Sequence, residues 1–438
     1  MLAKLHSRLG DFWWYSLMIF LACRVGDVMN AFVGLWLVPK YVDPSELGAV
    51  APLTQFALFL AIPVAAFANT FRNELSRLSI GREFGKLKTL LRGVFVAAAV
   101  FLLVAIVVAR FALPPFLERI RIGKGSLGIV IIASSFIGAV APIYSNALQA
   151  LKKFKTQSVL GIIGAPVRLV AMLIAMPFRA LTGYFAGQAA TPVFSIVTSV
   201  LALRKELSVP AEPYWTRETF KKFSSLLTIF LVIGIVGGFS GLVESTVIRQ
   251  RLPDIDSAGY YMATRFSEIA AFLGTTLCLT IFPFAADKAA EGKDLRPMIL
   301  KASAASMVFC LVVASPFAFF GQVILALLPH GDKYAAYWWA IPWLVVITAI
   351  GSPVGLYTTA QISANRFGYL KWCLPLDIAY PVLLLLVTGH GYFDGLIPAA
   401  WTDFLNAHNI CSLSAMLWWM TANCVVKMLF CFFAMRKR

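Results

Sequence analysis

The chain has 438 residues, of which 60% are hydrophobic and only 13% are charged, whereas soluble domains are about 45–50% apolar and about 25% charged. Apolar residues recur along the whole length, which excludes a soluble protein or a single anchor and predicts a polytopic membrane protein. The net charge of +17 does not indicate a nucleic-acid partner, because the basic residues fall in short loops, where they set topology and contact anionic membrane lipids.

Windows of about 20 apolar residues, the length that crosses a bilayer as a helix, predict twelve spans. In chain order they cover residues 13–38, 47–71, 90–113, 127–150, 157–178, 181–203, 222–248, 258–285, 299–328, 335–361, 369–389 and 411–434. The tenth span is the least regular, because Pro342 and Pro353 interrupt it. The expected fold class is therefore an all-α integral membrane protein with twelve transmembrane helices.

Basic residues are distributed unevenly between alternate loops. If both termini are cytoplasmic, 25 of the 38 Lys and Arg residues fall in cytoplasmic segments, and the long external loop 390–410 holds none. The positive-inside rule therefore predicts a multi-pass protein with its N- and C-termini in the cytoplasm. The loop around Arg119, Arg121 and Lys124 is the external one that disagrees.

The two halves of the sequence share three markers in the same order. Gly48 and Gly259 both follow an acidic turn and precede a long apolar run, and they are 211 residues apart. The stretch GREF at Gly81 matches GKDL at Gly292 with the same displacement, and a later match is displaced by 213 residues. Three markers at nearly constant displacement indicate an internal repeat.

The repeat predicts two pseudo-symmetric six-helix bundles, residues 1–203 and 222–438, joined by a polar cytoplasmic linker at 204–221. Paired bundles around a central cavity that opens to either side are the usual plan of alternating-access transporters. A duplicated structural bundle without a pathway is the alternative.

Charged residues inside the spans are the main functional signal, because each costs about 2.5–3.5 kcal/mol at a helix centre on insertion scales. Arg24 and Asp27 lie three residues apart in the first span, and Arg265 and Glu268 lie three apart in the eighth. Each pair therefore shares a helical face. Either the two residues of each pair neutralise each other within one helix, or they line a chamber between the bundles.

Three more charges have no oppositely charged residue one turn away, namely Arg168 in the fifth span, Glu244 in the seventh and Asp377 in the eleventh. Lys427, near the cytoplasmic end of the last span, is expected to snorkel to the surface. Because a guanidinium stays charged and offers phosphate two hydrogen bonds, the candidate ligands of an anionic substrate are Arg24, Arg168 and Arg265. Because buried carboxylates can exchange protons near neutral pH, the candidate ion-coupling residues are Glu244, Asp377, Asp27 and Glu268.

No cofactor or metal site is expected. The seven cysteines lie mostly inside apolar runs, with no CxxC motif and no pairing with histidine. The sequence has no phosphate-cradling GxxxxGK[ST] loop, which excludes ATP-driven transport by this chain alone. Coupling to H⁺ or Na⁺ stays open.

Three stretches carry a family resemblance, and they are YVDPSELGAV, NALQALKKFKTQSVLGIIGAPVRLV and SAGYYMATRFSEIAAFLGTTLCLTIFPFAA. In order and separation they resemble the polysaccharide-repeat-unit flippases of the multidrug/oligosaccharidyl-lipid/polysaccharide exporter (MOP) superfamily. The resemblance covers most of the first eleven predicted spans.

The resemblance implies a flippase of the bacterial inner membrane that translocates an undecaprenyl-pyrophosphate-linked oligosaccharide for surface polysaccharide synthesis. Relatives bind the anionic headgroup in a cationic cavity between the halves, and a proton or sodium gradient is thought to drive many of them. Lipid II flippases of the superfamily rely on arginines in the spans that hold Arg24 and Arg265, but they carry two further C-terminal helices. We therefore expect a surface-polysaccharide precursor as substrate, and a monomer that works beside a polysaccharide polymerase or glycosyltransferase.

Two other functions stay open on the sequence alone. A drug or metabolite cation antiporter of the same superfamily would favour an acidic cavity. The candidate cavity residues are three arginines and four carboxylates, and this charge count barely distinguishes an antiporter from a flippase. A membrane-embedded polysaccharide polymerase or ligase would place catalytic residues in a large external loop. The residues that loop 390–410 offers are His390, Asp394, Asp403 and His408, with no basic residue to hold a diphosphate, so we expect no enzyme.

Overall fold

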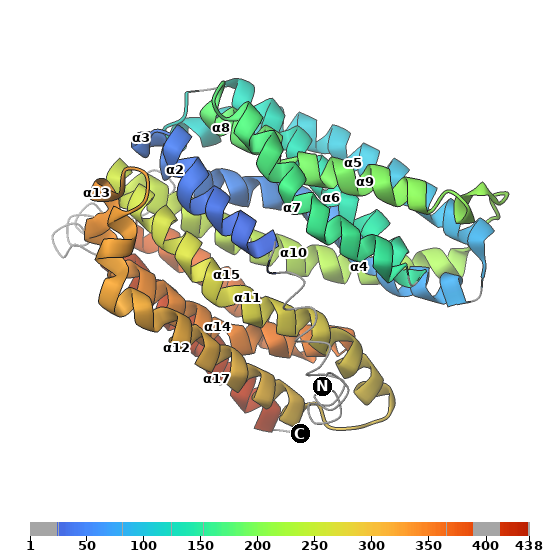
Figure 1. Cartoon of the computed structure of the whole chain (residues 1–438). Helices are drawn as coiled ribbons and strands as arrows, with labels where there is room; N and C mark the ends of the chain where they lie inside the picture. Colours follow the sequence, from blue (N-terminus) through green and yellow to red (C-terminus); the bar gives the residue numbers. More distant parts are fainter. Residues whose placement is uncertain are drawn as a thin grey trace, which may run out of the picture. The chain divides into compact units, whose positions relative to one another are not determined.

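The computed structural model describes residues 24, 26–80, 82–123, 125–151, 153–364, 366–388 and 412–436, and every regular element in these ranges is a helix (Figure 1). The longer helices are α4 (Val50–Ile80), α5 (Phe84–Arg119), α6 (Gly125–Ala150), α7 (Phe154–Ala175), α8 (Ala180–Gln188), α9 (Ala190–Ala202), α10 (Arg217–Arg251), α11 (Asp254–Ala290), α12 (Arg296–Ala326), α14 (Ala340–Ser363), α15 (Leu370–Thr388) and α17 (Leu413–Arg436). The short elements are η1 (Val33–Leu37), α2 (Val38–Tyr41), α3 (Pro44–Leu47), η2 (Glu206–Ser208), α13 (Gly331–Tyr334), η3 (Ala335–Tyr337) and η4 (Phe367–Tyr369).

Ten helical stretches in the described ranges are long and apolar enough to cross a membrane. They are Pro44–Phe71, Phe84–Arg119, Leu127–Leu148, Ala180–Ala202, Arg217–Arg251, Asp254–Phe282, Arg296–Ala326, Ala340–Ser363, Phe367–Leu386 and Leu413–Met435. A shorter apolar helix, Leu160–Ala175, lies where the fifth span was expected. Of the expected first span, 13–38, residues 13–23 and 25 lie outside the described residues. The chain is a multi-pass, all-helical membrane protein, as predicted, and the count of twelve spans stays a prediction.

The tenth span is more regular than its prolines suggest. Helix α14 runs without a break from Ala340 to Ser363. Pro342 falls in its first turn, where a missing N–H breaks no intrahelical bond, and Pro353 is buried inside the helix. The predicted interruption of this span is therefore wrong.

The described chain divides into two compact units. Unit 1 contains the described residues up to Gly48 and from Val247 onward, and unit 2 contains Ala49–Thr246. The bounds of these units differ from those of the sequence halves, 1–203 and 222–438, which rest on the repeat and stay a prediction.

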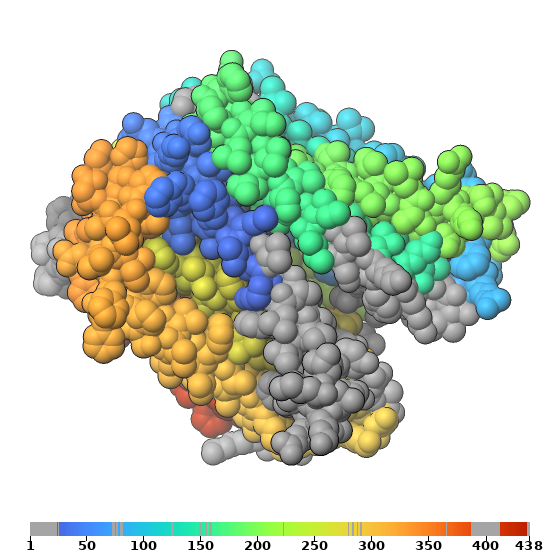
Figure 2. All heavy atoms as spheres, viewed as in Figure 1, coloured from blue at the N-terminus to red at the C-terminus, as the bar shows by residue number. Residues whose placement is uncertain are grey.

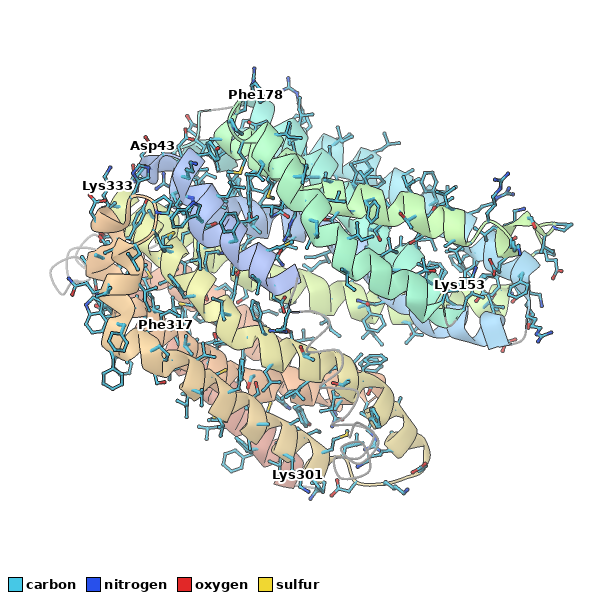
Figure 3. The ribbon with its side chains drawn as sticks, viewed as in Figure 1. Asp43, Lys153, Phe178, Lys301, Phe317 and Lys333 are labelled. Atoms are coloured by element: carbon cyan, nitrogen blue, oxygen red, sulfur yellow. The ribbon has the colours of Figure 1, made fainter. Side chains whose placement is uncertain are left out.

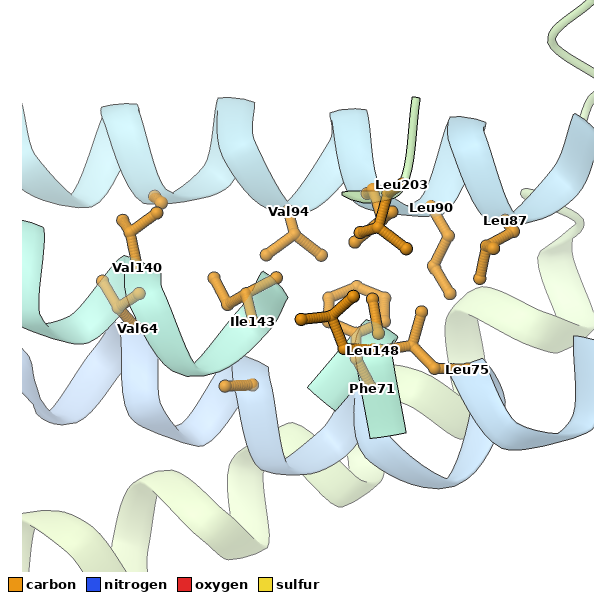
Figure 4. Close-up of a cluster of buried hydrophobic side chains, with 14 of the residues drawn as sticks. Val64, Phe71, Leu75, Leu87, Leu90, Val94, Val140, Ile143, Leu148 and Leu203 are labelled. Carbon is orange, nitrogen blue, oxygen red and sulfur yellow. The ribbon is translucent and has the colours of Figure 1, made fainter. Parts of the chain in front are cut away.

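The apolar core of unit 2 lies between α4, α5 and α6. In Figure 4, Leu87, Leu90 and Val94 of α5 project toward Ile143 of α6 and Phe71 of α4, and all five are buried. Farther along α5 the side chains turn outward, and residues from 100 to 108 include many exposed aliphatic groups. Exposure of so many aliphatic groups to water would be unfavourable, whereas the acyl chains of a bilayer would cover them.

The expected linker, 204–221, packs against unit 2. Lys88 Nζ of α5 donates to Val209 O at 2.8 Å, and Lys153 Nζ lies 2.8 Å from Glu206 Oε1. The ring of Trp215 packs among aromatic rings of α4 and α10, including an edge contact with Phe223 at 5.4 Å. The segment is therefore a fixed part of unit 2.

The helices of unit 1 meet at a buried arginine. Arg249, near the end of α10, is only 1% exposed. Its guanidinium donates to Asp254 Oδ1 at 2.9 Å, to Ser257 Oγ at 3.2 Å and to Ser45 O at 2.8 Å. The arginine thereby ties the end of α10 to the start of α11 and to α3.

Asp43, labelled in Figure 3, caps α3. Its Oδ1 accepts from Ser45 Oγ at 2.7 Å and from Ser45 N at 2.9 Å, and these hydrogen bonds lower the pKa of the Asp43 carboxyl. The cap holds the turn whose Ser45 carbonyl accepts from Arg249.

We expect Arg249→Ala to destabilise the chain by roughly 3 kcal/mol, because it removes a buried cation that donates to three oxygens. Thermal unfolding of the detergent-purified chain measures the loss. Arg217→Ala is the matched control, since it removes an exposed arginine at the other end of α10. Equal melting temperatures for the two variants would show that the buried arginine contributes nothing.

Candidate functional site

Within unit 1, Arg24 and residues 26–48 run antiparallel along α11. The Arg24 guanidinium lies over the Phe272 ring, Gly34 lies against Arg265, and Gly48 lies against Ser257. We call this contact between residues 24–48 and α11 the α11 seam. It brings together two arginines and two carboxylates that the sequence singled out.

Both predicted intrahelical ion pairs form on the α11 seam. Arg24 Nη2 lies 2.7 Å from Asp27 Oδ2, and Arg265 Nη2 lies 2.8 Å from Glu268 Oε1. The side chains of both arginines and of Asp27 are 21–23% exposed, whereas that of Glu268 is 53% exposed. Glu268 is therefore the most exposed side chain of the four.

An aromatic ring supports each arginine of the seam. The guanidinium carbon of Arg24 lies 4.8 Å from the centroid of Phe272, and that of Arg265 lies 4.9 Å from the centroid of Tyr261. Cation–π contacts of this kind orient the guanidinium plane while leaving its outer N–H groups able to bind an anion.

Gly34 makes room for Arg265. A Cβ at this position would lie 2.8 Å from Arg265 Cδ, which is closer than real side chains pack. The Tyr261 hydroxyl of α11 donates to the Gly34 carbonyl at 3.5 Å, which also shows that α11 lies close to the backbone at Gly34. The missing side chain is thus what allows Arg265 to lie along the first span.

Arg168 lies in unit 2, on α7, and faces α8. Its Nη1 donates to Gln188 Oε1 at 3.3 Å, and its buried Nε has no hydrogen-bond partner in the described part of the chain. No described carboxylate forms an ion pair with it. The sequence predicted a partner from another helix or from the substrate, and α8 supplies one in Gln188.

Glu244 lies in unit 2 on the α10 face that packs against α4. Three glycines precede it along this face, and the side chains of α4 that they meet include Ile62 at Gly234 and Gln55 at Gly241. Glu244 follows Gly241 by about one turn of α10. It is half-buried there.

Asp377 has a partner that the sequence reading set aside. Its Oδ1 accepts from Lys427 Nζ of α17, and its Oδ2 accepts from Cys373 Sγ at 3.2 Å. The side chains of Asp377 and Lys427 are only 19% and 15% exposed. The expectation that Lys427 snorkels to the surface is therefore wrong, and Asp377 forms an interhelical ion pair, because each charge offsets the desolvation of the other.

The sequence analysis also missed Arg249, which lies one residue beyond the predicted seventh span, 222–248. The available signal was an arginine one turn before a Leu-Pro break, followed by Asp254. The most distant partner, Ser45, is 204 residues away and could not be found from spacing.

Solved membrane transporters resemble this structure over most of its length. An inward-facing multidrug resistance MATE family transporter of the MOP superfamily matches with a TM-score of 0.66 and 12% identity, over 95% of each chain. A MOP superfamily transporter from Pyrococcus furiosus, reported to have a binding pocket of reverse polarity, gives 0.65 at 13% identity, over 98% of this chain and 96% of that one. The lipid II flippase MurJ, in an inward closed conformation, gives 0.60 at 13% identity, over 96% and 87%.

The sequence itself matches no protein-family model and no curated protein. At 12–13% identity the structural likeness establishes the fold alone. The chain therefore has the fold of MOP superfamily transporters, and its neighbours in structure are transporters, not enzymes. The resemblance to the superfamily is confirmed at the level of fold, and membership of the polysaccharide-flippase subfamily stays a prediction.

The pair of Asp377 and Lys427 predicts a non-additive pattern. Asp377→Asn or Lys427→Met alone leaves a buried charge without its partner, at a cost of roughly 3–5 kcal/mol, whereas the double variant removes both charges. We expect the double variant to unfold at a higher temperature than either single variant. Melting temperatures in one detergent test this, and additive losses would contradict the ion pair.

Proposed function

We propose that the chain is a flippase that moves a lipid-linked oligosaccharide diphosphate across the bacterial inner membrane by ion-coupled alternating access. The observation that carries the proposal is the pair of aromatic-supported arginines, Arg24 and Arg265, on one seam of a MOP-type fold. Two guanidinium groups suit a diphosphate because each can donate two parallel hydrogen bonds to phosphate oxygens.

The carboxylates of the seam give this site a means of coupling to protons. Glu268 and a substrate phosphate compete for the same Arg265 guanidinium. Protonation of Glu268 removes its negative charge and releases Arg265 to the diphosphate, and loss of the proton returns Arg265 to Glu268 and expels the substrate. Asp27 likewise competes with the substrate phosphate for the Arg24 guanidinium. The exchange of partners thereby links proton uptake to headgroup binding.

The remaining candidates keep distinct proposed roles. Arg168 is a third ligand for the anionic headgroup, supported by its buried Nε. Glu244 and Asp377 are further coupling carboxylates, and the Lys427 partner of Asp377 means that a proton must displace an ammonium there. Whether the coupling ion is H⁺ or Na⁺ is left to experiment.

Location and partners belong to the same proposal. The bias of Lys and Arg supports cytoplasmic N- and C-termini. We propose a monomer that receives its substrate from glycosyltransferases and delivers it to a polysaccharide polymerase. A central cavity between two pseudo-symmetric bundles is part of this proposal.

A cation antiporter is the second candidate, and the multidrug MATE transporters among the structural neighbours favour it. A cationic drug would bind carboxylates, so the half-exposed Glu268 would be its ligand and the arginines would oppose it. The polymerase or ligase alternative rests on residues 390–410, which lie outside the described residues.

We expect Arg265→Ala to abolish translocation of a fluorescent undecaprenyl-pyrophosphate oligosaccharide in proteoliposomes, because the diphosphate loses a bidentate ligand. Arg265→Lys should retain part of the activity, since it keeps the charge but not the planar fork. Lys371→Ala, an exposed charge outside the seam, is the control. Wild-type rates for Arg265→Ala, or ethidium transport without oligosaccharide transport in the parent chain, would contradict the flippase.

We expect Glu268→Gln to tighten headgroup binding about tenfold at neutral pH, the equivalent of about 1.4 kcal/mol, because the competing carboxylate is gone. In the parent chain the affinity should rise as pH falls and Glu268 takes up its proton, and in the variant this dependence should weaken. Titration of the chain with undecaprenyl pyrophosphate at several pH values measures both. Glu218→Gln, an exposed residue at the start of α10, controls for the titration of the substrate.

A further inference from the structure

A polar cavity of about 290 Å³ lies between α12, α14 and α17 of unit 1. Lys293 and Arg366 line it from the connections before α12 and after α14, and Arg296 lines it from the start of α12. Tyr357 and Gln361 line it from α14. Asp294 also lines it and caps the start of α12, since its Oδ1 accepts from the Arg296 N–H at 3.0 Å. The three basic side chains outnumber this carboxylate and favour a bound anion.

The charges around the cavity leave a surplus of positive charge. Lys293 Nζ lies 2.6 Å from Glu291 Oε2, and Arg296 lies beside Asp294 with its Nε 3.7 Å from Oδ1. Arg366, by contrast, forms no ion pair with a carboxylate in the described ranges. One guanidinium therefore remains available to a ligand that enters the cavity.

Gln361 gives an independent indication of a ligand. Its side chain lines the cavity and the residue is only 9% exposed. Among the described residues no hydrogen bond joins its side-chain amide to another group, so the amide is available to a molecule in the cavity. A phosphate oxygen in the cavity would accept from the amide nitrogen.

An apolar groove of about 520 Å³ adjoins this cavity. Leu300, Leu429, Phe432 and Phe433 line it, and it shares Arg296 and Met435 with the cavity. Leu300 and Phe433 are 44% and 60% exposed, so the groove lies at the surface of unit 1. Other parts of α12 are visible at the surface in Figure 2, in orange. A cationic cavity and an apolar groove that share residues fit an amphipathic molecule.

We propose that the cavity and the groove together bind one anionic phospholipid, with its phosphate in the cavity and an acyl chain in the groove. Charge complementarity selects an anionic headgroup, and the adjoining groove distinguishes a lipid from free phosphate. The site is separate from the α11 seam, and its occupant is a bilayer lipid, not the transported substrate. It lies on the side that the bias of basic residues predicts to be cytoplasmic.

Native mass spectrometry of the detergent-purified full chain, titrated with dioleoylphosphatidylglycerol or dioleoylphosphatidylcholine, tests the site. We expect the anionic lipid to bind more tightly than the zwitterionic one, and Arg366→Gln to weaken its binding about tenfold by removing a charge-assisted contact. Phe433→Ala should weaken it about fivefold through lost apolar contact. Lys301→Gln, an exposed charge on α12 that does not line the cavity and is labelled in Figure 3, should have no effect.

Three results would overturn the proposal. They are equal binding of the two lipids, unchanged binding by Arg366→Gln, and displacement of the anionic lipid by inorganic phosphate with no effect of Phe433→Ala, which would mean a free-anion site. If Arg366→Gln does not fold, Lys293→Gln replaces it, because that side chain is 67% exposed. Since Arg24 and Arg265 are intact in all these variants, failure here leaves the proposed transport function untouched.

Discussion

The bilayer interior offers no water to a polar group, and this constraint governs the chain. Its backbone meets the constraint by being helical throughout the described spans. Its charged side chains meet it with partners inside the protein, as Arg265 does with Glu268, Asp377 with Lys427 and Arg249 with three oxygens. Arg168 meets it only in part, through the amide of Gln188, and its buried Nε has no hydrogen-bond partner among the described residues.

What could be predicted from the sequence was local in the chain. Apolar runs of sufficient length become helices whatever their neighbours are, so most spans could be placed. The pairs Arg24–Asp27 and Arg265–Glu268 followed from a spacing of three, because one helical turn brings such residues together. The prediction that prolines interrupt the tenth span was wrong. Pro342 falls in the first turn of α14, where a proline costs no hydrogen bond, and the helix continues through Pro353.

Contacts between distant helices could not be read from spacing. Lys427 and Asp377 are 50 residues apart, and only the packing of α15 on α17 makes them partners. The same holds for the cavity between α12, α14 and α17. Its lining residues come from the start of α12, from α14 and the connection after it, and from the end of α17, which are far apart in the sequence. The fold is shared with solved transporters at only 12–13% identity, because one apolar residue can replace another in a span without changing the fold. Function depends instead on particular polar side chains, which the fold does not determine.

The Arg249 contact has a mechanical consequence. The chain passes between its two units at Gly48–Ala49 and again at Thr246–Val247. Arg249 and Ser45, each three residues or fewer from one of these crossings, are hydrogen-bonded to each other. Within unit 1, the residues next to both chain crossings are therefore held together by one hydrogen bond. A substitution that removes the Arg249 guanidinium would release the end of α10 from the turn that starts α3, and both crossings would lose this common anchor.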